Sequence, residues 1–144
     1  MTSTSTSPAR SASPAERRSA FRPILILLSA FVGVSTVMEV LLAALTVSGV
    51  DVAIAIWIRC SLVLASSVLL LLFGIGAARG SRSSWVRLSI VAPVVVVAVI
   101  VIVSIPGFLP DWVRIQQALC GLLVLPVAIL AVLPRTRALF PRKR

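Results

Sequence analysis

The sequence of 144 residues contains no histidine and no tyrosine, and only 4 of its residues are Asp or Glu. The lack of histidine excludes a Ser-His-Asp triad, other His-based acid–base chemistry and every zinc site that needs an imidazole ligand. The 2 cysteines are too few for a structural metal site built from thiolates. The remaining residue types assemble no nucleophile with a nearby base. We therefore expect no enzyme activity and no cofactor.

Apolar residues are abundant instead. They make up 59% of the chain, against roughly 45–50% in a typical soluble domain. A helix needs about 20 mostly apolar residues to cross a hydrocarbon core about 30 Å thick. The segments that meet this requirement are 24–46, 54–78, 86–105 and 112–133. The sequence therefore predicts an all-α integral membrane protein, a four-helix bundle within residues 23–133.

The third of these segments is so rich in Val and Ile that its propensity favours a β-strand. An isolated strand would leave its backbone groups unpaired in lipid. A barrel would need alternating segments of about ten residues, which this chain lacks. We therefore expect a helix here too.

The 14 basic residues are unevenly placed. All but Arg59 and Arg114 lie before the first apolar segment, between the second and third, at the start of the third (Arg87), or after the fourth. The positive-inside rule then puts both termini and the middle loop in the cytoplasm, an N-in/C-in topology in the cell membrane. This arrangement also explains the net charge of +10. Arginines that flank spans, without interleaved aromatics, do not indicate nucleic-acid binding.

The two ends of the chain differ from the spans in composition. Residues 1–22 are rich in Ser, Thr, Ala and Pro, which predicts a disordered cytoplasmic tail. Residues 134–144 form a second, basic tail. We expect the basic tails to contact anionic lipid headgroups.

Glu39 is the acidic residue inside an apolar segment, where an ionisable group is costly and usually has a partner or a task. Counting about 20 residues from the cytoplasmic ends of the first two segments brings Glu39 and Arg59 to similar depth on antiparallel helices. The sequence therefore predicts an intramembrane ion pair between them. The alternative is that Glu39 binds protons or cations during transport, a task for which a neutralising arginine is poorly suited.

A helical wheel at 100° per residue groups Ser29, Thr36, Glu39 and Ala43 on one face of the first segment, with Phe31, Met38 and other bulky residues opposite. Membrane helices usually pack through small and polar residues. We therefore expect the Glu39 face to point into the bundle and the bulky face to point toward lipid.

The fourth segment starts with Asp111, which we expect to be the N-cap of its helix and to pair with Arg114 one turn later. Further along, Gln117, Gly121, Val124 and Ala128 form a narrow lane suited to close helix contact. Gly74 and Ala78 form a small-xxx-small pair in the second segment. The depths of Cys60 and Cys120 differ by several ångströms, which disfavours a disulfide.

The stretch Pro-Gly-Phe-Leu-Pro-Asp-Trp at residues 106–112, followed by Gln-Ala-Leu-Cys-Gly-Leu-Leu at residues 117–123, resembles uncharacterised small four-span membrane proteins of high-GC Gram-positive bacteria. The resemblance covers roughly the second to the fourth segment. It implies a bacterial cell membrane and transfers no activity.

The lanes of small residues indicate contact between helices, within a homo-oligomer or with a larger membrane protein. The sequence therefore favours a non-enzymatic accessory or structural membrane protein that acts through such contacts. The alternative is a small oligomeric transporter or channel that uses Glu39.

Overall fold

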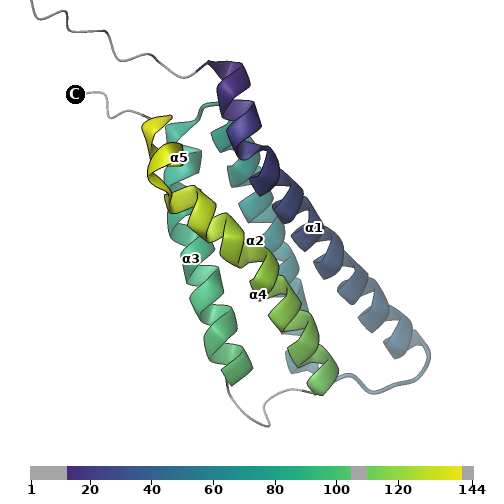
Figure 1. The fold of residues 1–144 in the computed structure, drawn as a ribbon. Coiled ribbons are helices and arrows are strands. Elements are labelled where there is room, and N and C mark those ends of the chain that lie inside the picture. The colour runs from purple at the N-terminus through teal and green to yellow at the C-terminus, as the bar shows by residue number, and fades with distance from the viewer. Residues whose placement is uncertain (1–12, 105–109, 141–144) are drawn as a thin grey trace, which may run out of the picture.

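The computed structural model describes residues 13–104 and 110–140, and this part of the chain folds into helices without a strand (Figure 1). The helices are α1 (Pro14–Val47), α2 (Ile54–Ala78), α3 (Arg82–Ser104), α4 (Asp111–Val132) and the short α5 (Pro134–Ala138). The first four are long and apolar enough to cross a membrane. This confirms the prediction of an all-α protein with four apolar helices, including the Val- and Ile-rich α3.

Helix α1 begins at Pro14, so the expectation of disorder up to residue 22 is wrong for its second half. Ser13 is the N-cap: its Oγ accepts from the Glu16 backbone N–H at 3.2 Å, while Glu16 Oε2 accepts from the Ser13 N–H at 2.7 Å. This capping box, with proline at the first helical position, is a sequence signal for a helix start. The hydrogen bond that the Ser13 N–H donates to the carboxylate, followed by the Ser13 hydroxyl, holds the pKa of Glu16 below its ordinary value. Residues 1–12 lie outside the described part of the chain.

Short connections place consecutive helices antiparallel. Gly49 (φ 80°) ends α1 and Gly80 (φ 98°) ends α2, both in the left-handed conformation that glycine adopts most readily. Each C-terminal turn is closed by a backbone hydrogen bond from the residue after the glycine, Val50 to Leu45 and Ser81 to Gly76. This is the Schellman arrangement of a helix end.

The four long helices pack in a ring, in which α1 contacts α2 and α4, and α3 contacts α2 and α4. Figure 1 shows α1 and α2 as one antiparallel pair and α3 and α4 as the other, with the start of α1 and with α5 on the same side of the bundle. The core runs along the bundle axis and contains Phe21, Leu28, Phe31, Leu70, Leu88 and Val124. A second, smaller cluster joins Met38, Leu42, Cys60 and Val113 near the opposite end.

Helix α5 and the two residues after it close one end of the bundle, where the sequence predicted only a basic tail. Pro134 has no N–H for the Leu130 carbonyl, and the Thr136 hydroxyl donates to that carbonyl instead, at 2.7 Å. Phe140 stacks on Trp85 of α3 at a centroid distance of 5.4 Å and meets Phe21 of α1 edge-on at 6.1 Å. The basic segment is therefore anchored from Pro134 to Phe140, and residues 141–144 lie outside the described chain.

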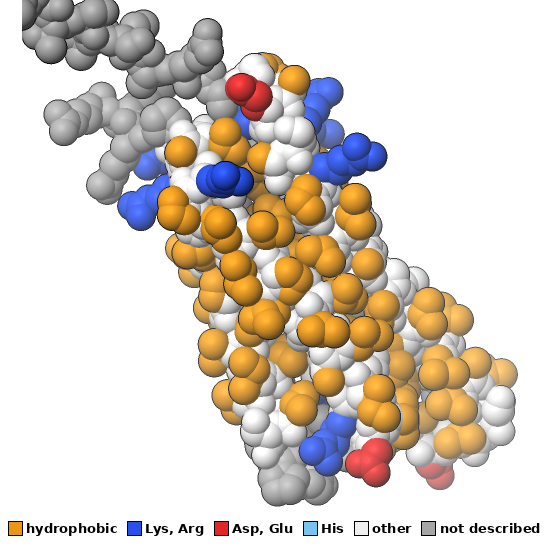
Figure 2. All heavy atoms as spheres, viewed as in Figure 1, with side chains coloured by type: hydrophobic (Ala, Val, Ile, Leu, Met, Phe, Trp, Pro, Cys, Tyr) orange, Lys and Arg blue, Asp and Glu red, His pale blue; other side chains and the backbone are white. Residues whose placement is uncertain are grey.

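Basic side chains gather at this same end. Figure 2 shows them on the visible face near the start of α1, while apolar side chains cover the middle of the bundle. They come from the start of α1, as far as Arg22, from the α2–α3 connection, from the first two turns of α3, and from α5. Arg59 and Arg114 lie near the other end of the bundle, in the first half of α2 and the first half of α4.

Candidate functional site

The half of the bundle that contains the α1–α2 loop, called the outer half below, holds the polar residues singled out from the sequence. Glu39 lies two turns before the end of α1, and Arg59 lies in the second turn of α2. Gln117 lies in the second turn of α4 and is only 3% exposed. These three helices therefore bring a carboxylate, a guanidinium and a carboxamide to the same half of the bundle.

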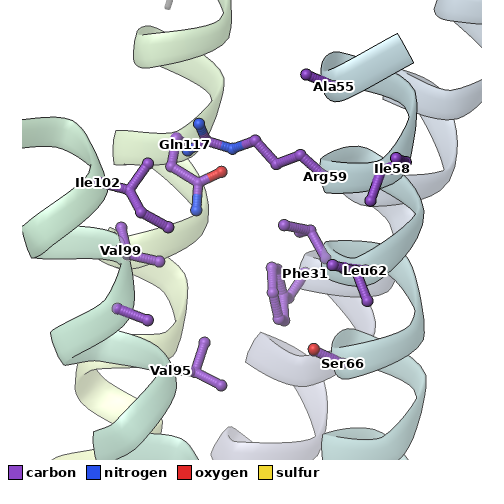
Figure 3. A pocket seen from close by; sticks show the side chains of 12 residues that line it. Phe31, Ala55, Ile58, Arg59, Leu62, Ser66, Val95, Val99, Ile102 and Gln117 are labelled. Atoms are coloured by element: carbon purple, nitrogen blue, oxygen red, sulfur yellow. The ribbon is translucent and has the colours of Figure 1, made fainter. Parts of the chain in front are cut away.

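The predicted ion pair between Glu39 and Arg59 is absent from the structure. Glu39 Oε1 and all three nitrogen atoms of the Arg59 guanidinium are buried and have no hydrogen-bond partner among the described residues. Figure 3 shows the Arg59 side chain extending from α2 toward Gln117 of α4. Similar depth along two helices does not fix the direction in which each side chain points, and here Arg59 turns away from α1.

Arg59 extends into a cavity of about 400 Å³ in the outer half. The walls come mainly from α2 (Ala55 to Ser66) and α3 (Val95 to Ile102), with Phe31 of α1 and Gln117 of α4 between them (Figure 3). The polar side chains of the lining are those of Arg59, Ser66 and Gln117. The cavity is therefore an apolar cleft between α2 and α3 with a cation at its outer end.

The α1 face that contains Ser29, Thr36 and Ala43 is exposed, so the prediction that it points into the bundle is wrong. The bulky face is the buried one, with Phe31 at 1% and Leu42 at 0% exposure. The centre of the ring of helices needs large side chains to fill it, and small residues on this helix would leave voids. Ser29, Thr36 and Ala43 are consequently turned outward, whereas Ser35 of α1 is buried.

The predicted packing lanes on α2 and α4 are used inside the bundle. A Cβ added at Gly74 would lie 2.8 Å from Leu28 Cδ1 of α1, and one at Gly121 would lie 2.8 Å from Val99 Cγ1 of α3. Gln117, Val124 and Ala128 of the same lane on α4 are buried, and Ala78 packs against the edge of the core. These lanes hold the four helices together and are not free for a partner.

At the outer end of α4 the N-cap is Pro110 and not Asp111, so that prediction is wrong. Pro110 has extended backbone angles (φ −55°, ψ 146°), and its carbonyl accepts from the N–H groups of Val113 and Arg114 at 3.0 and 3.1 Å. Asp111 is therefore already the first helical residue. Its Oδ1 lies 3.7 Å from Arg114 Nη1, with side chains 93% and 40% exposed. Such an exposed pair contributes at most about 1 kcal/mol.

Cys60 and Cys120 are both buried and free. Within residues 13–104 and 110–140, no three His, Cys, Asp or Glu side chains converge in a group that could hold a metal ion. The chemistry that the outer half does offer is recognition of an anion by a buried guanidinium, beside an apolar surface.

Fold and cleft together define a class: a four-helix bundle whose helices are suited to cross a membrane, with a cleft at the side of its outer half. Comparison of the chain with protein-family models, with curated proteins and with solved structures gave no match.

Proposed function

We propose that this chain is a non-enzymatic accessory protein of a bacterial cell membrane, with both termini in the cytoplasm, which acts by packing α1 against a helix of another membrane protein. The topology is supported by the basic residues at the end of the bundle where α1 begins and α5 ends, because arginines accumulate on the cytoplasmic side of membrane proteins.

The observation that carries this proposal is the row of small residues on the exposed face of α1. Ser29, Gly33, Thr36 and Ala43 all lie on this face, which they share with the exposed Ile26 and Val40. A Cβ at Gly33 would meet nothing within 4 Å, in contrast to Gly74 and Gly121. Contact with lipid does not require small residues on a helix surface. Contact with a second helix does favour them, because they let the two backbones approach closely. The Thr36 hydroxyl donates to the Val32 carbonyl at 2.8 Å, so it does not hinder the approach.

Glu39 adds a second, independent observation at the edge of this face. The wheel places it within 80° of Ser29, Thr36 and Ala43, and its Oε1 is buried without a partner in the described chain. An ionisable group at this depth normally has a partner. A hydrogen-bond donor on the neighbouring helix would satisfy it.

Site-specific covalent capture in native membranes tests the proposal. A photoreactive amino acid at Gly33 is expected to capture one membrane protein, identified by mass spectrometry. The same amino acid at Ala65, a small exposed residue of α2, is expected to capture lipid instead. Capture of lipid alone from both positions would contradict the proposal. Capture of a second copy of this chain at Gly33 would replace the accessory role with self-association.

The second candidate is a small oligomeric transporter or channel that uses Glu39. It is favoured by the absence of an ion pair with Arg59 among the described residues, since no arginine then neutralises the carboxylate. For a transporter, Glu39→Gln abolishes proton-coupled flux in vesicles while the folded yield stays unchanged. For the accessory role, the same substitution weakens partner capture from position 33 and leaves ion flux at background.

A further inference from the structure

The guanidinium of Arg59 is an unusual feature of the outer half, because its Nε, Nη1 and Nη2 are all buried and none has a hydrogen-bond partner in the described chain. A charge buried at membrane depth without compensation is costly. The side chain extends into the cleft between α2 and α3, toward Gln117 (Figure 3). An anion that enters the cleft would supply the missing acceptors, and the planar guanidinium fork suits a phosphate or a carboxylate.

The rest of the cleft is apolar and elongated. Its α2 wall runs from Ala55 to Ser66, which corresponds to about 16 Å at 1.5 Å per residue. Half of a hydrocarbon core about 30 Å thick is about 15 Å, so the cleft spans the depth of one leaflet. Exposed residues at its rim, Ile58 and Leu62 on α2 and Ala98 on α3, show that it opens to the side of the bundle.

We propose that this cleft binds one phospholipid, through its anionic phosphate, from the leaflet on the side of the α1–α2 loop. The phosphate pairs with Arg59 and accepts a further hydrogen bond from the Gln117 amide, while an acyl chain lies between α2 and α3 toward Ser66 and Val95. Charge complementarity selects the occupant, because an apolar helix or a lipid without a phosphate would leave the guanidinium unpaired. The cleft is separate from the exposed face of α1, so the test of lipid binding is independent of the test of the accessory role.

The test uses the full chain in nanodiscs that contain phosphatidylglycerol with a photoreactive group in one acyl chain, and peptide mapping by mass spectrometry. We expect labelling of residues that line the cleft, such as Leu62 and Val95. Arg59→Gln should lower this labelling roughly tenfold, the size expected when one charge-assisted contact is lost. Arg114→Gln is the matched control, because it removes an arginine of the outer half that does not line the cleft. It should leave the labelling unchanged.

Two further experiments distinguish the contribution of the lipid phosphate from that of the acyl chain. A diacylglycerol probe with the same photoreactive chain, which has no phosphate, should label the cleft roughly tenfold less than phosphatidylglycerol. Excess glycerol phosphate, which has no acyl chain, should not compete. If Arg59→Gln fails to fold, Ala98→Phe serves as the second variant. It keeps the arginine and narrows the cleft between α2 and α3, so it should also reduce labelling of the residues that line the cleft. Equal labelling by both lipids, competition by glycerol phosphate, unchanged labelling in Arg59→Gln or Ala98→Phe, or an equal loss in Arg114→Gln would overturn the proposal.

Discussion

Arg59 of α2 and Glu39 of α1 lie in the outer halves of neighbouring helices, yet their charged groups form no ion pair, and Arg59 extends toward Gln117 on the far side of the cleft (Figure 3). The side chains of Glu39 and Arg59 therefore lie in two different environments. Glu39 borders the exposed face of α1, and Arg59 lines the cleft between α2 and α3.

Exchange of the two charges tests this separation. The variants Glu39→Arg and Arg59→Glu should each lower the free energy of unfolding. Their combination should not recover it, because no ion pair is re-formed by the exchange. The combined effect is expected to be additive within about 0.5 kcal/mol, as for independent sites. Thermal unfolding in detergent micelles measures this, and a double variant as stable as the parent would reveal a direct pair.

Glycine substitutions distinguish packed from open helix faces. Alanine is favoured over glycine in a helix by about 1 kcal/mol, so Gly33→Ala should stabilise α1, where a Cβ meets open space. Gly121→Ala should lose this gain, because the new Cβ would approach Val99 Cγ1 to 2.8 Å and overpacking costs about 1–3 kcal/mol. Unfolding in micelles should therefore rank Gly33→Ala above Gly121→Ala. Equal stability of the two variants would contradict the packing of α4 against α3.

The capping box makes the start of α1 sensitive to acid. Its Ser13 hydrogen bonds lower the pKa of Glu16 in the folded state, so the stabilisation is present above the ordinary pKa of a glutamate. It is lost as the pH falls through the lowered value. Carbon-13 shifts of Pro14 to Arg18 should then move from helical toward coil values, whereas those of the α1 centre stay helical. In Ser13→Ala the transition should shift to higher pH. An unchanged midpoint in that variant would contradict the capping box.

The positions of the helices could be predicted from the sequence better than the directions of their side chains. The spans could be predicted because length and apolar composition alone decide which segments cross a membrane, and even α3 follows since lipid overrides its β-propensity. The start of α1 could also have been found, because Ser13, Pro14 and Glu16 form a known N-terminal signature. It was obscured by the polar composition around it.

The directions of side chains could not be predicted in the same way. The two faces of α1 are both largely uncharged, so the helical wheel shows that they differ but not which one is buried. Large side chains are needed to fill the centre of the bundle, and Phe31 and Leu42 are therefore buried there. For Arg59, equal depth with Glu39 left open whether the long side chain turns toward α1 or α4. The structure shows that it extends toward Gln117 of α4.

Phe140 joins α5 to the bundle, and removal of its ring should lower stability. The ring is 7% exposed and contacts Trp85 and Phe21. Phe140→Ala should therefore lower the free energy of unfolding by about 3 kcal/mol and alter the fluorescence of Trp85. Arg137→Ala, on the exposed side of α5, should change neither quantity. A silent Phe140→Ala variant would show that α5 is not anchored.

The most direct test of the account concerns the exposed face of α1. Gly33→Leu adds a large side chain where the bundle itself has open space, and Ala65→Leu adds one on the exposed side of α2. The measurement is the size of the assembly that contains each variant, extracted from native membranes in a mild detergent and resolved by native electrophoresis. The account predicts that Gly33→Leu folds normally but runs as the isolated chain, while Ala65→Leu keeps the larger assembly. An unchanged assembly in Gly33→Leu, or an equal loss in Ala65→Leu, would contradict it.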